Sequence, residues 1–190
     1  MAVREKRNVD ALLAESFKEL VKRRPADKIT IKEITDGAGV IRPTFYNHFK
    51  DKYELLEWII KDELLAPVKP LIASRMIKEA LVFLFRNIEQ EKNFYSQIVK
   101  LEGQNSFESI ILNSLMEILL EIIPEDTVRA MPKYEWLTAE RVAAFYAQNM
   151  CYVAITWIKS GYQVSGRELA DIYEYMMKSS MDEMFYGTMH

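Results

Sequence analysis

The stretch "TIKEITDGAGVIRPTFYNHF" (30–49) constrains the fold of this chain more than any other. Thr30 followed by Glu33 has the spacing of a capping box, in which each side chain bonds the other's backbone amide at a helix start. Gly37 and Gly39 then end this first short helix, and either can supply a positive φ. A second short helix follows the turn. Two short helices around a glycine-containing turn are typical of a helix-turn-helix.

The rest of the chain also favours helix. Gly and Pro occur only six times each in 190 residues, and no period-two alternation indicates a strand. The remaining helices are predicted at 7–24, 52–66, 72–90, 92–101, 105–123, 137–160 and 166–186, with a long loop at 123–136. We expect an all-α fold of about nine helices, with an N-terminal three-helix domain at residues 1–50 and a helical domain at 51–190.

Composition narrows the class of protein. Apolar residues make up 49% of the chain, which indicates a globular protein with a hydrophobic core. The single cysteine excludes an internal disulfide framework. The sequence has neither an apolar run of about 18 residues nor a signal peptide at its start, so we expect a cytoplasmic protein without a membrane partner.

Charge is distributed unevenly along the chain. Residues 1–50 contain 11 Lys and Arg against 7 Asp and Glu, whereas residues 51–190 contain 14 against 21. A basic N-terminal domain on an acidic body suggests that the N-terminal domain has an anionic partner. Ordinary surface variation is the alternative explanation.

The segment "TIKEITDGAGVIRPTFYNHFKDKYELL" resembles the DNA-binding part of the TetR family of bacterial transcriptional regulators. The likeness extends over about residues 5–65. It rests on Ile34, Ala38, Gly39, Val40, Thr44, Phe45, Tyr46, His48, Phe49, Lys52 and Leu55. The resemblance implies a double-stranded DNA operator as partner.

In a helix-turn-helix, the start of the second helix meets base edges in the major groove and flanking residues bind phosphates. The residues expected to contact DNA here are Thr30, Arg42, Pro43, Thr44, Tyr46, Asn47, His48 and Lys52. Arg42 suits bidentate hydrogen bonding to guanine. Phe45 and Phe49 are expected in the core. A solvated Arg42 and a packing role for Tyr46 are the alternatives.

The second helix has a weak start. Family members often have an N-cap residue such as serine there, but this chain has Ile41, which cannot cap. The missing cap costs an isolated helix about 1 kcal/mol. Pro43 is tolerated because amides of the first turn lack intrahelical partners.

Two apolar stripes in the C-terminal half predict a homodimer built from four helices. The first consists mainly of small residues at helical spacing and the second of larger ones. They are Ala143, Ala147, Cys151, Ala154 and Ile158, and Leu169, Ile172, Tyr173, Met176, Met177 and Ser180. The alternative is that both stripes belong to the core of one subunit.

Apolar and aromatic residues on the middle helices are candidates for an effector pocket. They are Phe83, Phe94, Tyr95, Ile98, Phe107, Ile111, Tyr146, Asn149, Met150 and Trp157. Such residues are also typical of plain core. A pocket of this kind would take a small, largely apolar effector.

The segment at 145–177 is similar to a TetR subgroup that includes DhaS-type regulators. The resemblance implies a ligand-responsive dimeric regulator, with repression as the default. The alternative it raises is a coactivator that responds to a protein partner in place of a small molecule. Two histidines and one cysteine do not suggest a metal site, and no catalytic residues or cofactor are expected.

Overall fold

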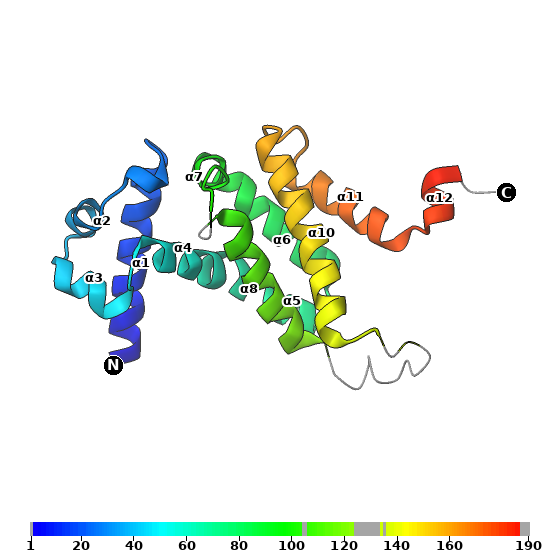
Figure 1. Cartoon of the computed structure of the whole chain (residues 1–190), viewed down its shortest axis with the longest axis horizontal. Coiled ribbons are helices and arrows are strands. Elements are labelled where there is room, and N and C mark those ends of the chain that lie inside the picture. The colour runs from blue at the N-terminus through cyan, green and yellow to red at the C-terminus, as the bar shows by residue number, and fades with distance from the viewer. Residues whose placement is uncertain (1, 104–105, 124–133, 135, 187–190) are drawn as a thin grey trace.

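The computed structural model of the chain describes residues 2–103, 106–123, 134 and 136–186, with side chains from Asn8 onward. Over these residues every regular element is helical, which confirms the all-α prediction (Figure 1). Most of the loop predicted at 123–136 lies outside the described residues. The α-helices are α1 (Ala2–Val21), α2 (Ile31–Ala38), α3 (Arg42–His48), α4 (Lys52–Trp58), α5 (Lys69–Ala73), α6 (Ile77–Gln90), α7 (Lys92–Ile98), α8 (Phe107–Ile122), α10 (Ala139–Lys159), α11 (Gly166–Lys178) and α12 (Met181–Tyr186).

Helices α1, α2 and α3 form a head at one end of the molecule (Figure 1). Its core contains Leu13 and Phe17 from α1, Ile34 from α2 and Phe45 from α3, each at most 1% exposed. Because apolar residues recur at three- and four-residue steps, each helix turns one stripe inward.

Helix α4 leads from the head into the body (Figure 1). Asp51 caps it by accepting hydrogen bonds from the amides of Tyr53 and Glu54, at 2.8 and 2.9 Å. The single helix expected over 52–66 instead continues as a π-helix, η2 (Ile59–Leu65), followed by the short 3-10 helix η3 (Ala66–Val68). Helical turns of the π type are rare in proteins, and those that do occur are often found at functional sites.

The body consists of α5–α8, α10 and α11, with α10 packed against α8 and α11 against α6. Two predicted helices are each divided. The helix predicted over 72–90 is interrupted before α6, where Arg75 has a φ of +60°. The helix predicted over 166–186 ends at Ser179. Ser180 and Glu183 then form a capping box that starts α12. The sequence shows this Ser-x-x-Glu signal, which the helix prediction over 166–186 missed.

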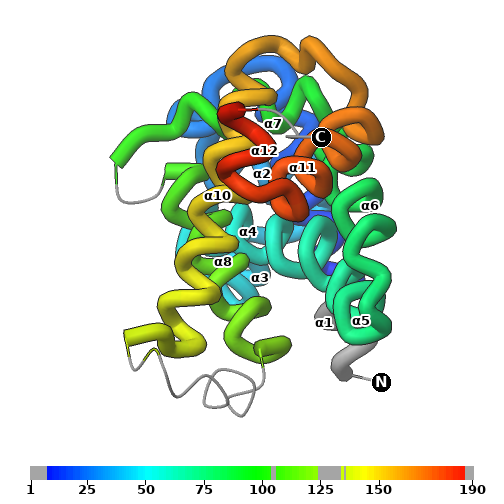
Figure 2. Tube along the Cα trace, turned by 90° about the vertical axis from the view of Figure 1, so that its right-hand side faces the viewer, coloured from blue at the N-terminus to red at the C-terminus, as the bar shows by residue number. Residues whose placement is uncertain are grey.

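Helices α11 and α12 lie on the side of the molecule opposite the head (Figure 1), and Figure 2 views that side with α10, α11 and α12 towards the reader. None of the described helices has the length and apolarity needed to span a membrane.

Candidate nucleic-acid interface

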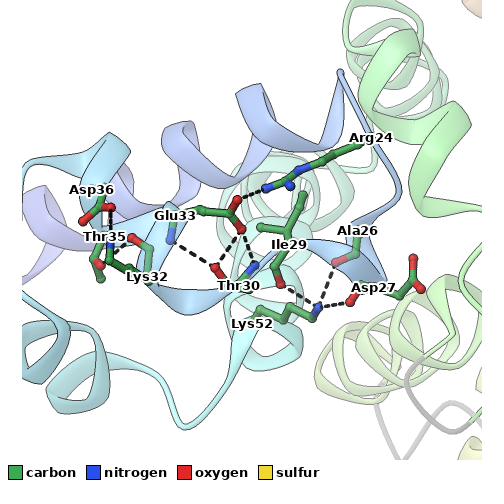
Figure 3. Close-up of polar contacts among 10 residues, drawn as sticks. All are labelled: Arg24, Ala26, Asp27, Ile29, Thr30, Lys32, Glu33, Thr35, Asp36 and Lys52. Carbon is green, nitrogen blue, oxygen red and sulfur yellow. Dashed lines mark hydrogen bonds and ion pairs between the residues drawn. The ribbon is translucent and has the colours of Figure 1, made fainter.

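The start of α2 is fixed by the predicted capping box (Figure 3). The amide and hydroxyl of Thr30 donate to Glu33 Oε2 at 2.9 and 2.7 Å, and the Glu33 amide donates to the Thr30 hydroxyl at 3.3 Å. Arg24 pairs with the other carboxylate oxygen of Glu33. Hydrogen bonds from Arg24 and Thr30 lower the pKa of Glu33 to about 2. The Thr30 hydroxyl is exposed but already engaged within the box.

The turn between α2 and α3 depends on Gly39. This residue has a φ of +69° and caps α2, and the following amide of Val40 donates to the Thr35 carbonyl at 3.0 Å. Side chains other than glycine rarely adopt this conformation. Gly37 instead lies inside α2, where an added Cβ would be 2.3 Å from the Ser16 hydroxyl oxygen. Gly39 therefore makes the turn, and Gly37 allows α1 to approach α2.

Helix α3 presents an exposed polar face on an aromatic base. Phe45 and Phe49 are 0% and 5% exposed, as predicted. On the opposite side, the Arg42 guanidinium donates to the Tyr46 hydroxyl at 3.2 Å. Pro43 and Asn47 also face solvent, and Thr44 is half-buried.

Ile41 precedes α3 without a side-chain capping bond, as expected. The cost of the missing cap is offset by burial of Phe45 and Phe49 beneath the helix. Ile41 itself is 69% exposed and lies beside the polar face of α3. An exposed isoleucine next to this face adds an apolar contact point to it.

His48 lies differently from the sequence-based expectation. Its Nδ1 is 2.6 Å from Oδ1 of Asp10 on α1, and the two side chains are only 11% and 10% exposed. His48 turns towards α1 and its Nδ1 ties the end of α3 to that helix, while the expected phosphate contact of this residue stays a prediction. A long-range pair of this kind has no signal in the sequence.

Lys52 is also committed within the protein (Figure 3). Its ammonium group donates to the carbonyl oxygens of Ala26, Asp27 and Ile29 at 2.9, 2.7 and 2.8 Å. Burial lowers the pKa of Lys52. Because these bonds use all three ammonium protons, Lys52 anchors α4 to the segment between α1 and α2 in the free protein, and its expected phosphate contact stays a prediction.

Most of the residues predicted to line an effector pocket form the core of the body. Phe94, Tyr95, Ile98, Phe107, Ile111 and Trp157 are at most 4% exposed. The Asn149 amide donates to the carbonyl oxygen of Phe145 on its own helix, at 2.6 Å. Phe83 lines a separate depression beside Arg167. Apart from Phe83, these residues pack in the core or bond locally in this structure, and their role in an effector pocket stays a prediction.

A mainly apolar cavity of about 570 Å³ lies instead between η2, η3, α6, α8, α10 and α11. Tyr146 and Met150 line it, so these two predicted residues are placed in a cavity. Its other apolar lining residues include Leu65, Leu84, Leu115, Tyr173 and Met177. Sequence reasoning missed these because their apolar spacing looks the same as that of closed core.

The predicted dimer stripes are only partly available to a second subunit. The stripe on α10 is buried within its own subunit: Ala143, Ala147, Cys151, Ala154 and Ile158 are at most 4% exposed. Leu169 and Tyr173 of α11 are similarly buried. The expected dimer role is corrected for these seven residues, because neighbouring helices of the same subunit already cover them. Burial also raises the pKa of the Cys151 thiol to about 12.

The opposite faces of α10 and α11, together with α12, expose large apolar side chains. These are Phe145, Tyr146, Tyr152, Ile172, Tyr175, Met176, Met177, Met181, Met184, Phe185 and Tyr186, each at least 37% exposed. Ser180 is exposed beside them. We call this set the α10–α12 surface. Four residues of the predicted interface, Ile172, Met176, Met177 and Ser180, belong to it.

Comparison with known proteins agrees with this architecture. A family model described as "Bacterial regulatory proteins, tetR family" matches residues 17–59, and one described as "Transcriptional regulator C-terminal region" matches residues 76–179. The chain is 23% identical over 168 residues to the DhaS transcriptional activator of the dhaKLM operon of Lactococcus lactis, which covers 87% of this chain and 85% of the relative.

Solved structures show the same fold. The dihydroxyacetone kinase operon activator DhaS has a TM-score of 0.65 at 20% identity, over 89% of this chain and 93% of that one. FadR of Thermus thermophilus, a TetR-family repressor solved with lauroyl-CoA, has a TM-score of 0.54 at 20% identity, over 90% and 94% of the two chains.

The C-terminal model alone covers more than half of the chain, and the second model covers the helix-turn-helix. The matched families and the DhaS relative are transcriptional regulators, not enzymes. The chain therefore belongs to the TetR family of transcriptional regulators.

Proposed function

We propose that this chain acts as a ligand-responsive homodimer that binds a palindromic DNA operator. The observation that carries the proposal is the exposed face of α3, on which Arg42 and Tyr46 lie together above the buried Phe45 and Phe49. A rigid aromatic base holds this face in one orientation, as a helix that enters the major groove requires.

Each exposed residue on this face suits a particular contact. Arg42 reads guanine through two parallel hydrogen bonds, and Ile41 and Pro43 offer apolar contact to thymine methyl groups. Tyr46 accepts from Arg42, which leaves its own hydroxyl proton free to donate to a phosphate. Thr44 and Asn47 add hydrogen bonds to bases or backbone, and Thr30 at the start of α2 would reach a phosphate once its hydroxyl releases Glu33.

The α10–α12 surface supports the homodimer. Many large apolar side chains are exposed on this surface, and monomeric proteins rarely expose large apolar patches. A second copy related by two-fold symmetry would cover it with the same residues. Its position opposite the head leaves both copies of α3 free for half-sites about 34–36 Å apart, or a near multiple.

The effector site in this proposal is the apolar cavity, which suits a small, largely apolar molecule. Leu65 of its lining belongs to η2, which continues the helix from the head, and Tyr173 and Met177 belong to α11 of the dimer surface. A molecule seated there touches both the connection to the head and the dimer helix. Binding of the effector would change the separation of the two heads and so release the operator. The ligand would then relieve repression.

The second candidate is an activator that responds to a protein partner. The likeness to DhaS, named as an operon activator, favours it. Under this alternative the DNA contacts are the same, but a protein takes the place of the small molecule. Calorimetric titration with apolar metabolites, compared with capture of proteins encoded by neighbouring genes, separates the two candidates.

The DNA-binding proposal is tested by electrophoretic mobility shift with DNA from upstream of the protein's own gene. Arg42→Ala and Tyr46→Ala should each weaken binding by about tenfold or more, as expected for the loss of about 1–3 kcal/mol of contact energy. Arg167→Ala, an exposed arginine on α11, is the matched control and should bind as the unmodified protein does. If Arg42→Ala and Tyr46→Ala bound this DNA as tightly as Arg167→Ala does, the proposed DNA contacts of α3 would be wrong.

A further inference from the structure

A second depression, distinct from the apolar cavity, lies where the head meets the body. Asp10 of α1, His48 of α3 and Phe49 line its head side, and residues of α4, η2 and α8 line the other side. Its volume is about 560 Å³. We call it the junction groove.

The junction groove is strongly acidic. Its lining contains six carboxylates, from Asp10, Glu54, Glu57, Asp62, Glu117 and Glu121, and only two lysines. Lys61 pairs with Glu57 at 2.8 Å and with Glu117 at 2.7 Å, and Lys69 pairs with Glu121 at 2.7 Å. Asp10 also pairs with His48 at 2.6 Å. Six carboxylates against two ammonium groups still give the lining a negative net charge. A groove with this charge attracts cations.

Ser114 on α8 gives a second, independent sign of a ligand. It is 1% exposed, lines the junction groove, and its hydroxyl has no hydrogen-bond partner among the described residues. A buried hydroxyl left without a partner costs about 1–3 kcal/mol. A ligand atom at the base of the groove that bonds this hydroxyl would remove that cost.

The groove also has an apolar wall. The rings of Phe49 and Trp58 meet edge to face with centroids 6.2 Å apart, and Ile118 of α8 also lines the groove. Methylene groups pack against such a wall, and an ammonium group is attracted to an aromatic face.

We propose that the junction groove binds a short linear polyamine. Glu117 and Glu121 lie one helical turn apart on α8, about 6 Å along the axis, and Glu54 and Glu57 lie about one turn apart on α4. Ammonium groups separated by three or four methylenes match this spacing, and the methylenes match the apolar wall. A metal ion fits less well, since no three His, Cys, Asp or Glu side chains within the described part of the chain are placed to hold one.

The position of the groove links this ligand to the head. A polyamine that bonds Glu117 and Ser114 on α8 while packing its methylenes against Phe49 of the head bridges head and body. Occupancy therefore favours one placement of the head, by a route separate from the apolar cavity.

The test is isothermal titration of the full-length protein with spermidine, in the absence of DNA because DNA itself binds polyamines. One molecule should bind per chain. The double variant Glu57→Gln/Glu121→Gln, with one change on each wall, should weaken binding at least tenfold, and Ser114→Ala should weaken it severalfold. Glu108→Gln, an exposed acid on the same helix α8, is the matched control and should leave binding unchanged.

Circular dichroism of each variant checks that the fold is retained, and Mg²⁺ at equal concentration serves as the cation control. Saturation by spermidine but not by Mg²⁺, with loss only in the groove variants, would support the proposal. Absence of binding, equal binding of Mg²⁺, or equal affinity in the groove variants and Glu108→Gln would overturn it. Because no DNA is present, these outcomes are independent of operator binding.

Discussion

The Nδ1 atom of His48, the last residue of α3, lies 2.6 Å from Oδ1 of Asp10 in the middle of α1. Both side chains are nearly buried, so this pair is shielded from water. The end of α3 is thus held against the first helix of the head by a polar contact as well as by Phe45 and Phe49.

Removing this contact should loosen α3. We expect Asp10→Ala to lower the free energy of unfolding by about 1–3 kcal/mol, because it leaves the nearly buried imidazole without its partner. Urea denaturation followed by circular dichroism measures this. Asp36→Ala, which removes an exposed i,i+4 pair with Lys32 on α2, is the control and should change stability little. Equal effects of the two changes would show that the His48 contact is unimportant.

Lys52 offers a test between a structural and a DNA-binding role. We expect Lys52→Met to lower the free energy of unfolding by about 2 kcal/mol, because three carbonyl oxygens lose a charged donor. The measurement is urea denaturation of the free protein.

The same variant distinguishes the two roles through salt. A direct phosphate contact would reduce the slope of log affinity against log salt by about one when lost. If Lys52→Met changed this slope but left stability intact, the anchoring role would be wrong. Lys50→Met, an exposed neighbour, is the control for general charge loss.

The capping box predicts a pH dependence. The folded-state pKa of Glu33 is about 2, below its ordinary value of 4.5. A carboxyl group whose pKa is lowered by folding stabilises the protein above the unfolded pKa, and this stability is lost as the carboxylate is protonated. Stability from Glu33 should therefore be complete above about pH 5 and decline between about pH 4.5 and 2.

Urea midpoints measured across this range should fall less steeply for Glu33→Gln, which keeps the capping geometry but cannot ionise. Glu168→Gln, an exposed acid in the first turn of α11, serves as the control. Identical pH profiles for the unmodified protein and Glu33→Gln would refute the assignment.

The contact between α11 and α6 depends on a missing side chain. An added Cβ at Gly166 would lie 2.7 Å from both the carbonyl carbon and the carbonyl oxygen of Phe85. Backbone cannot move aside as a flexible side chain can, so Gly166→Ala should lower the thermal midpoint, at a cost of about 1–3 kcal/mol. Differential scanning calorimetry measures it. The neighbouring Arg167→Ala should be nearly neutral, and a neutral Gly166→Ala would mean that the helices lie farther apart.

The dimer role proposed for the α10–α12 surface is tested by placing a negative charge on it. Tyr152 is 71% exposed on α10, and Tyr152→Asp should shift the protein from dimer to monomer in sedimentation velocity, since a buried unpaired carboxylate opposes association. Leu12→Asp places the same charge at an exposed apolar residue of α1, 47% exposed, and should leave the dimer intact. A dimer retained in Tyr152→Asp and lost in Leu12→Asp would place the interface elsewhere.

Local patterns in the sequence predicted the all-α class, the capping box at Thr30 and Glu33, the uncapped start at Ile41 and the inward faces of Phe45 and Phe49. These features depend on residues three or four positions apart, whose geometry the helix itself imposes. The Ser180 and Glu183 box was equally local and was missed only because helix periodicity continued across it.

Other features depended on tertiary structure. The partners of His48 and Lys52 lie 38 and 23–26 residues away, and no local pattern selects them. The small-residue stripe on α10 specified a close helix neighbour, but only the packed fold decided that α8 fills that role inside the subunit. Apolar spacing alone likewise does not separate closed core from cavity wall. The sequence by itself determined which faces of the helices are apolar; the tertiary structure decided which neighbour each face meets, because that depends on how all the helices pack together.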